Sequence, residues 1–352
     1  MKNNPRIEYM KLLKIIIFYL FFSFLIFHST GLASNLGRQH TISGKTMGTF
    51  YTIKFISTQK ESPAVWKNKV DVRLKEVNKK LSMYDPESEL SRFNRQKISI
   101  PVHISSDFYT LLLTAKKLYQ MTDGSWDGTV KPLVDLWGFG TKKRTNQIPE
   151  PDKITLAVSK TGFNHIHIKK SKMIDKTIDV TLDLGSIAKG YGVDAIATLF
   201  TSSGIQDLLV EIGGELYASG KNKKGEYWSV GISRPDKQFA NQSLYKIVRL
   251  NNQALATSGN YRNFFEINGK TFSHIIDPKT GFPVDNQIVS ASVISKDCTF
   301  ADGLATALMV MDVQKGIKLV NRLEQTECLI IQKKDQTLVS HMSENFDDFV
   351  MK

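Results

Sequence analysis

Hydrophobic residues recur along this chain with two periods, one helical and one that alternates as in a β-strand. Apolar side chains three or four positions apart predict an amphipathic helix over residues 63–81, at Val65, Val70, Leu74, Val77 and Leu81. A second helix is predicted over residues 105–122, where Asp123-Gly124 supplies the stop signal. Alternation over residues 45–56 predicts a strand before both helices.

The second half of the chain consists of short apolar stretches separated by turn residues. These stretches predict strands at 178–182, 207–212, 215–219, 228–232, 245–250 and 289–295, with further strands at the end of the chain. Helices are predicted between them, at 186–200, at 297–311 and in a following stretch that ends at Leu323. Asn268-Gly269 predicts a hairpin turn, and the polar segment 141–152 predicts a surface loop. The predicted fold class is α+β, with mixed, largely antiparallel sheets flanked by helices.

The first 33 residues have the order of a secretory signal peptide. Four basic residues precede the apolar run 15–27, and the small residues Gly31 and Ala33 follow it. We expect cleavage after Ala33, because a run of 13 residues is short for a membrane span of roughly 20. The alternative is a retained N-terminal anchor in the inner membrane. In both cases we expect residues 34–352 to form a single exported domain on the periplasmic side.

Charge and cysteine content narrow the possible partners. The formal net charge of the 352 residues is +13, which favours anionic partners or an anionic membrane surface. Nucleic acid is not predicted as a partner, because the basic residues are scattered and an exported protein meets little nucleic acid. The chain has two cysteines, Cys298 and Cys328. They form either a disulfide or two buried free thiols.

One turn of the predicted helix 297–311 carries the most informative residues. Residues three and four apart on a helix face the same way, so Asp302 projects beside Ala305 and Thr306. Oxygen ligands of this kind suit Mg²⁺, whose other positions are filled by water and substrate phosphate. The alternative is an Asp that interacts with the dipole at the helix N-terminus.

Two further stretches have features of a catalytic pocket. In Asp183-Leu-Gly-Ser186-Ile-Ala-Lys189, a strand leads through a glycine turn to a helix N-terminus, which suits a phosphate group or is a plain tight turn. In Ser273-His274-Ile-Ile276-Asp277-Pro278, a strand ends with a histidine, which can act as a general base or be structural.

Three weaker signals accompany them. Trp126, in Gly124-Ser125-Trp126-Asp127, offers an aromatic face that could stack on a planar ring or lie in the core. Gly213-Gly214 lies between two predicted strands, as a hairpin turn or a point of close backbone approach. The stretch 257–262 is predicted as a loop that offers hydroxyl groups and the guanidinium of Arg262, a natural partner for phosphate.

Eight motifs in one order resemble the ApbE family, the FAD:protein FMN transferases. The resemblance spans about residues 40–350 and rests on Met47-Gly48-Thr49-Phe50, Ser88-Glu-Leu-Ser-Arg92-Phe93-Asn94, Asp127-Gly-Thr-Val-Lys-Pro-Leu-Val with Trp137-Gly-Phe-Gly, Asp183-Leu-Gly, Gly213-Gly214, Ser258-Gly259-Asn-Tyr-Arg, Ser273-His274-Ile-Ile-Asp277-Pro and Ala301-Asp302-Gly-Leu-Ala-Thr306. Each motif alone is weak, whereas eight in the same order are specific.

The resemblance implies an exported, Mg²⁺-dependent enzyme with an ApbE-like fold. Such an enzyme cleaves FAD at its pyrophosphate, transfers FMN to a Thr or Ser hydroxyl of another protein and releases AMP. Acceptors in the family include subunits of the sodium-pumping quinone reductase and of Rnf-type electron-transport complexes. The FAD-binding residues it implies are Met47, Tyr84, Ser125, Trp126, Asp127, Asp183, Lys189 and Ile276. The metal-binding residues it implies are Ser186, Asp302, Ala305 and Thr306, and the base is His274.

The chain departs from the family pattern at two positions, and two other functions are possible for it. Ala305 can offer only its carbonyl oxygen, and Lys189 is expected at phosphate or ribose and not at the metal. An FAD pyrophosphatase would use water in place of the acceptor hydroxyl, but the bulky ring of Tyr84 is expected to help exclude water. A non-catalytic exported flavin-binding protein would need neither a metal site nor a base.

Overall fold

An eight-stranded sheet, with strand order β1-β2-β6-β7-β10-β13-β14-β15, forms the centre of the fold. The computed structural model describes residues 37–58, 61–140, 147–235, 243–260, 264–267, 269–335 and 337–351. The chain divides after Arg38 into two units, and the second, Gln39–Lys352, carries the architecture described below.

The strand pairings from β2 across to β15 in this sheet are antiparallel. Its strands are β1 Arg38–Thr46, β2 Thr49–Ser57, β6 Leu208–Ile212, β7 Glu215–Ser219, β10 Gln253–Gly259, β13 Ile288–Ser295, β14 Glu327–Lys334 and β15 Thr337–Met342. The smaller sheets pair β3 Val102–His103 and β4 Ile166–Ile168 with β5 Met173–Lys176, β8 Trp228–Ser233 with β9 Leu244–Leu250, and β11 Phe264–Ile267 with β12 Lys270–Ser273.

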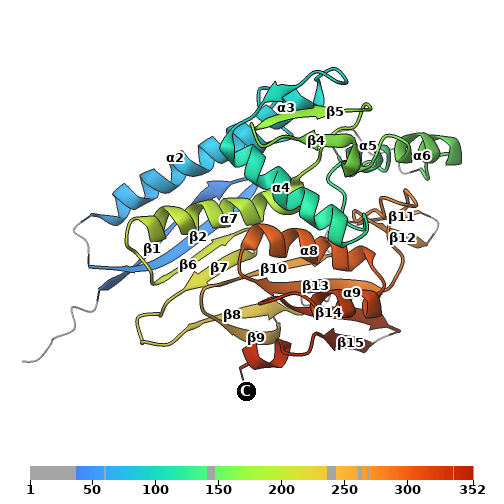
Figure 1. Cartoon of the computed structure of the whole chain (residues 1–352). Helices are drawn as coiled ribbons and strands as arrows, with labels where there is room; N and C mark the ends of the chain where they lie inside the picture. The colour runs from blue at the N-terminus through green and yellow to red at the C-terminus, as the bar shows by residue number, and fades with distance from the viewer. Residues whose placement is uncertain are drawn as a thin grey trace, which may run out of the picture. The chain divides into compact units, whose positions relative to one another are not determined.

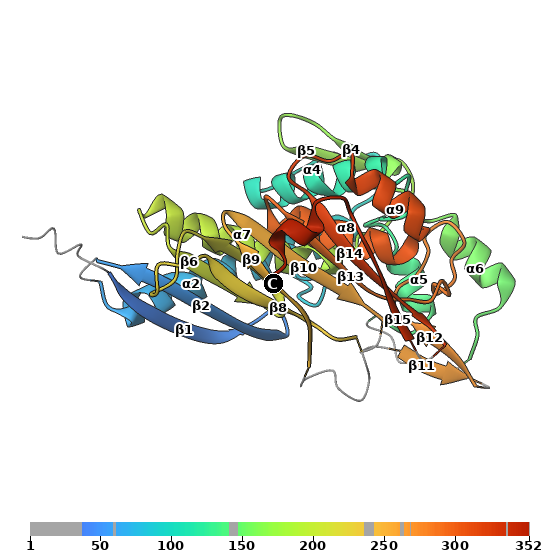
Figure 2. The same ribbon diagram turned by 90° about the horizontal axis from the view of Figure 1, so that it is seen from below.

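Helices cover one face of the central sheet, and the β8–β9 hairpin packs against the other (Figure 1). Alternating side chains explain the two layers. Ala254 and Ala256 of β10 belong to the core beneath the helices, whereas Leu255 between them joins the core beneath β8 and β9. Figure 2 gives a second view of the same layers.

The helices differ in how much of their surface is buried, from the largely accessible α2 to the almost fully buried α8. They are α2 Pro63–Leu81, α3 Glu89–Asn94, α4 Ser106–Met121, α5 Lys131–Leu136, α6 Pro151–Val158, α7 Gly185–Ser202, α8 Cys298–Val310 and α9 Val313–Val320, with short 3-10 turns at Phe163–His165 and Phe346–Phe349. None of the helices in the described part of the chain combines the length and the apolar content that crossing a membrane requires.

Helices α7 and α8 approach each other closely, and this contact positions the site. A Cβ atom on Gly190 of α7 would lie 2.4 Å from the carbonyl oxygen of Cys298, so the approach requires glycine. The Asp194 carboxylate of α7 accepts hydrogen bonds of 2.8 Å from the backbone N–H groups of Cys298 and Thr299. N–H groups at the start of a helix have no acceptor within the helix itself. Asp194 supplies that acceptor and fixes this end of α8 against α7.

Most of the predicted elements are confirmed. Helix α2 has the predicted bounds, and α4, α7 and α8 differ from the predictions only at their ends. The strands predicted at 207–212, 215–219, 228–232, 245–250 and 289–295 are β6, β7, β8, β9 and β13. The α+β fold class with antiparallel sheets is confirmed as well. Cys298 and Cys328 are buried free thiols, so they form no disulfide.

One strand prediction is wrong at its start and another is wrong throughout. The strand predicted at 45–56 is β2 from Thr49 onward, but the chain turns back before it at Met47 and Gly48, whose φ angles are 48° and 70°. The segment 178–182 forms only an isolated bridge, between Thr181 and Val130. The side-chain amide of Asn94 accepts from the N–H of Leu182 at 2.7 Å and donates to its carbonyl at 2.9 Å. A side chain therefore satisfies this backbone in place of a neighbouring strand.

Other differences concern loops. Thr257 and Ser258 were expected in a loop but lie in β10, paired with Ser292 and Ala291 of β13. Helix α6 begins at Pro151, so the end of the predicted loop 141–152 is helical. The hairpin predicted at Asn268-Gly269 is confirmed by the antiparallel pairing of β11 with β12, in which Ile267 lies opposite Lys270. Four parts of the chain with predictions lie outside the described residues, and those predictions stay predictions: the signal segment 1–33, the loop residues 141–146, Tyr261 and Arg262.

Candidate active site

A pocket of about 1510 Å³ opens where α7 and α8 meet the ends of the central strands. Its walls come from the β1–β2 turn, the start of α7, the β6–β7 turn, strand β10, the inner face of α8 and the loop after β12. Ligand pockets for drug-sized molecules have volumes of roughly 300–1,000 Å³. This pocket therefore has space for a ligand of dinucleotide size.

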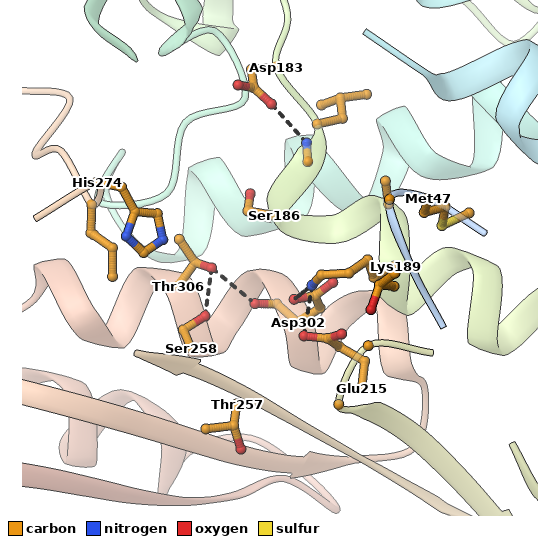
Figure 3. Close-up of a pocket in the computed structure, with 18 of the residues that line it drawn as sticks. Met47, Asp183, Ser186, Lys189, Glu215, Thr257, Ser258, His274, Asp302 and Thr306 are labelled. Atoms are coloured by element: carbon orange, nitrogen blue, oxygen red, sulfur yellow. Dashed lines mark hydrogen bonds and ion pairs between the residues drawn. The ribbon is translucent and has the colours of Figure 1, made fainter. Parts of the chain in front are cut away.

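Oxygen atoms line the side of the pocket formed by α8 (Figure 3). Asp302 is 3% exposed, and its Oδ2 accepts a hydrogen bond of 3.0 Å from the N–H of Gly190. One turn later, the Thr306 hydroxyl donates to the Asp302 carbonyl at 3.3 Å and lies 2.9 Å from the Ser258 hydroxyl. Burial raises the pKa of Asp302 to about 7, although the Lys189 ammonium opposes this shift.

An ion-pair cluster of two buried carboxylates and one partly exposed lysine lies next to this oxygen-rich side. Lys189 Nζ is 2.7 Å from Glu215 Oε1 and 3.7 Å from Asp302 Oδ1. Burial acts to lower the pKa of Lys189, but the Asp302 and Glu215 carboxylates outweigh it and the pKa is raised. Sequence reasoning missed Glu215 as a site residue. The signal that could have found it is its place directly after Gly213-Gly214.

A side-chain hydrogen bond joins Trp126 to Ser186 in the pocket lining. The indole Nε1 of Trp126 donates to Ser186 Oγ at 3.0 Å. The Trp126 side chain is 2% exposed, so the prediction that it offers an open face for stacking is wrong. Its ring packs among core residues instead, and the polar edge reaches the pocket. The structure therefore favours the core alternative for this tryptophan.

Two aspartates lie close to these residues in the sequence: Asp127 directly follows Trp126, and Asp183 precedes Ser186. Asp127 is buried and accepts hydrogen bonds from the N–H and hydroxyl of Thr129, at 2.8 and 2.6 Å. Burial raises the pKa of Asp127 despite these hydrogen bonds. Burial also raises the pKa of Asp183, whose Oδ1 accepts from the N–H of Gly185 at 2.9 Å. This N–H group at the start of α7 was expected to face phosphate, and Asp183 already occupies it.

His274 follows the last residue of β12 and enters the pocket from the side of the β11–β12 hairpin (Figure 3). Its ring centroid is 6.3 Å from that of Phe139, in an edge arrangement. The next turn is fixed by Asp277, whose carbonyl accepts from the N–H of Gly281 at 2.8 Å and whose carboxylate accepts from that of Lys279 at 2.9 Å. The hairpin and this turn hold His274 and its neighbours on the pocket wall.

Aromatic residues form part of the pocket rim. Tyr84 and Phe50 line the opening and are 75% and 66% exposed, respectively. The structure brings together all predicted site residues except Ala305, namely Met47, Tyr84, Ser125, Trp126, Asp127, Asp183, Ser186, Lys189, His274, Ile276, Asp302 and Thr306. Ala305 is fully buried and does not line the pocket. The individual roles of these residues stay predictions.

The donor set of the pocket fits a hard divalent cation that also binds substrate. Within the described residues, no group of three His, Cys, Asp or Glu side chains could hold a metal ion alone. Mg²⁺ usually takes only one or two carboxylates and completes its shell with water and phosphate oxygens. Asp302, the Thr306 hydroxyl and the buried Glu215 Oε2, which receives no hydrogen bond from the part of the chain that the structure describes, are donors of this kind.

Known proteins resemble this chain over most of its length. A sequence model described as the ApbE family matches residues 47–330. A Vibrio cholerae protein named FAD:protein FMN transferase is 40% identical, over 88% of this chain and 92% of its own length. The Escherichia coli protein of the same name is 35% identical, over 88% and 89%.

Solved structures show the same fold. The flavin transferase ApbE from Vibrio cholerae superposes with a TM-score of 0.81 at 38% identity and covers 89% of this chain and 99% of its own. The ApbE protein from Thermotoga maritima superposes with a TM-score of 0.78 at 28% identity, over 90% of this chain and all of its own. The predicted resemblance is confirmed, and this chain belongs to the ApbE family.

Proposed function

We propose that this chain is an FAD:protein FMN transferase that depends on Mg²⁺ and attaches FMN to a Thr or Ser hydroxyl of an acceptor protein, with release of AMP. Its membership of the ApbE family and the matching name of relatives that cover most of the chain support the activity. The observation that carries the mechanism is the convergence of His274 with the oxygen donors of α8 on one large pocket.

FAD is the proposed occupant of this pocket. The pocket has the volume for a dinucleotide, and its lining combines apolar walls with a few polar groups. We assign contacts to FAD to Met47, Tyr84, Ser125, Trp126, Asp127, Asp183, Lys189 and Ile276. Lys189 supplies positive charge for the phosphates, and the buried Trp126 contributes its polar edge and not a stacking face.

Asp302, the Thr306 hydroxyl and Ser186 are the proposed holders of Mg²⁺, whereas Ala305 does not line the pocket and is left out of this set. The cation would neutralise charge on the pyrophosphate of FAD as it builds up on the departing AMP phosphate. The protein's own part is to orient these oxygens. The Thr306 hydroxyl directs its proton at the Asp302 carbonyl, so the Ser258 hydroxyl donates to the Thr306 oxygen. The second lone pair of the Thr306 oxygen then stays available for the cation.

His274 is the proposed general base. An acceptor hydroxyl is a weak nucleophile until a base removes its proton. In the proposed step, His274 accepts that proton while the hydroxyl oxygen forms a bond to the FMN phosphorus. The bond between this phosphorus and the bridging oxygen breaks, and the electron pair leaves with AMP. A rim of exposed aromatic rings, Tyr84 and Phe50, borders the entrance for the acceptor segment.

The proposed acceptors are subunits of the sodium-pumping quinone reductase or of Rnf-type complexes, at the periplasmic face of the inner membrane. The supporting observation is the signal-like order of basic, apolar and small residues over 1–33. Nucleic acid is not a proposed partner.

The decisive experiment incubates the protein with FAD, Mg²⁺ and an acceptor domain, and follows AMP release and acceptor mass together. We expect a mass gain of one FMN that is lost with EDTA and in Asp302→Ala. Release of AMP and free FMN without acceptor labelling would instead indicate an FAD pyrophosphatase. Retention of FAD without AMP release would indicate a flavin-binding protein.

A further inference from the structure

Three charged side chains from three separate elements meet in one cluster in the pocket lining. Lys189 comes from α7, Glu215 from the start of β7 and Asp302 from α8 (Figure 3). Glu215 and Asp302 are 4% and 3% exposed. Two buried carboxylates in one cluster repel each other unless a cation lies between them, and here the Lys189 ammonium supplies that charge.

Only one of the two carboxylate oxygens of Glu215 has a partner in this cluster. Its Oε1 binds Lys189 Nζ at 2.7 Å, whereas its Oε2 is buried and accepts no hydrogen bond from any described residue. Burial of a carboxylate oxygen without a hydrogen-bond donor destabilises the folded protein, because the oxygen loses its hydrogen bonds to water and forms none with the protein. Glu215 lines the pocket, and the cluster therefore keeps one buried carboxylate oxygen that no donor among the described residues satisfies.

A divalent cation and the Lys189 ammonium cannot share the space between Glu215 and Asp302. An ammonium group that remained within ion-pair distance of the same carboxylates would repel a divalent cation bound there. Lysine has a flexible four-carbon stem and a compact charge, so its ammonium can leave without moving the helix. The stem of Lys189 borders the open pocket, where the phosphates of FAD are proposed to bind.

We propose that Lys189 is a built-in counterion: its ammonium occupies the cation position between Glu215 and Asp302 in the metal-free protein and leaves Glu215 when a divalent cation binds. Glu215 then becomes an additional cation ligand through Oε2. The inference rests on the proposed function only in that a divalent cation works in this pocket. The released ammonium becomes available to an anionic substrate, so cation and substrate binding support each other.

Binding of Mn²⁺ alone, without FAD, tests the proposal. Titrations followed by the electron paramagnetic resonance signal of free Mn²⁺ compare the wild type with Lys189→Met and Glu215→Gln. We expect Lys189→Met to bind Mn²⁺ about tenfold more tightly, since no ammonium has to be displaced. Glu215→Gln should bind it about tenfold more weakly. Equal or weaker binding by Lys189→Met would overturn the proposal.

Lys80→Met is the matched control for the loss of one positive charge. Lys80 is 2.7 Å from Asp107 and 32% exposed, close to the 2.7 Å and 30% of Lys189, and it does not line the pocket. Its removal should leave Mn²⁺ affinity unchanged. A gain equal to that of Lys189→Met would mean that overall charge causes the effect, and would contradict a local exchange.

Chemical labelling separates exchange from simple repulsion. In the wild type, acetylation of Lys189 by acetic anhydride, measured by peptide mass spectrometry, should accelerate several-fold when Mn²⁺ replaces EDTA. Labelling of Lys80 in the same sample should not change. An unchanged rate at Lys189 would show that the ammonium stays in place. These readouts need neither FAD nor acceptor, so a failure of FMN transfer alone would reject the proposed function and leave this inference standing.

Discussion

The indole Nε1 of Trp126 donates a hydrogen bond of 3.0 Å to the hydroxyl oxygen of Ser186. Trp126 follows the end of α4, where the Thr122 hydroxyl accepts from its backbone N–H at 3.1 Å. Ser186 lies in the first turn of α7, 60 residues later in the chain. A buried aromatic side chain thus fixes the orientation of a hydroxyl group that faces the pocket.

Trp126→Phe tests this link. The substitution keeps an aromatic ring in the core but removes the only donor of the indole. We expect the free energy of unfolding to fall by about 1 kcal/mol. We also expect the rate of FMN transfer to fall about tenfold, because Ser186 is free to turn away from the proposed metal site.

The matched control is Trp228→Phe. Trp228 is 5% exposed and donates to the carbonyl of Ser219 at 2.9 Å, but it does not line the pocket. This variant should lose similar stability, measured by urea unfolding, and keep the transfer rate. If Trp126→Phe also keeps the full rate, the orientation of Ser186 by Trp126 has no role in transfer.

Thr306→Val tests the hydroxyl at the centre of the oxygen cluster. Valine has nearly the same shape but removes the oxygen that lies 2.9 Å from the Ser258 hydroxyl. We expect the Mg²⁺ concentration for half-maximal transfer to rise about tenfold. Thr306→Ser restores the hydroxyl and should recover most of the affinity. An equal loss in both variants would mean that restoring the hydroxyl does not restore the affinity, and would contradict a role for this oxygen.

The contacts that could be predicted from the sequence are those with short separation. Asp302 and Thr306 are four residues apart on one helix, so helical periodicity alone placed them on one face. The approach of Lys189, Glu215 and Asp302 could not be predicted in this way. It depends on the Gly190 contact between α7 and α8 and on the turn of Gly213 and Gly214, which connects β6 to β7.

The errors have a similar cause. The residues 178–182 alternate like a strand, but the partner of their backbone is the side chain of Asn94, which lies 88 residues from Leu182. Thr257 and Ser258 have loop-like side chains, yet they pair with β13 inside the central sheet. Tertiary partners override local propensity in both cases, and one sequence does not show those partners.

Asp107 predicts how stability depends on pH. The hydrogen bond from Arg73 is the largest cause that lowers the pKa of Asp107, with Lys80 and Tyr191 adding to it. A lowered folded-state pKa stabilises the protein above the unfolded-state pKa of about 3.9, and this stability is lost as the pH falls below that value. Asp107→Asn should therefore reduce the free energy of unfolding by about 2 kcal/mol at pH 7 and by less at pH 3.

Urea unfolding at both pH values measures this difference, with Glu150→Gln as the control. Glu150 is 73% exposed, and its partner Lys153, 3.1 Å away, is 62% exposed, so this ion pair should contribute little. The control should change stability by less than about 0.5 kcal/mol at either pH. A loss for Asp107→Asn that does not shrink at pH 3 would contradict an ionic origin.

Gly190→Ala tests whether the close contact of α7 and α8 holds the site together. The added Cβ would lie 2.4 Å from the carbonyl oxygen of Cys298 and 2.8 Å from Cα of Thr299, and backbone atoms of a buried helix cannot move aside. Overpacking of this kind costs about 3 kcal/mol or more, well above the gain of about 1 kcal/mol for alanine in a helix. We expect low soluble yield and an early urea midpoint.

Gly192→Ala provides the comparison within the same helix. Its Cβ would approach only side-chain ends, 2.9 Å from Cε of Met47 and 3.1 Å from Cδ1 of Ile212, and these can shift. Its free energy of unfolding should therefore change by about 1 kcal/mol or less. Because Lys189 and Asp302 flank the Gly190 contact, any folded Gly190→Ala protein should also bind Mn²⁺ more weakly than Gly192→Ala. Equal stability and equal Mn²⁺ affinity in the two variants would show that this contact does not position the cluster.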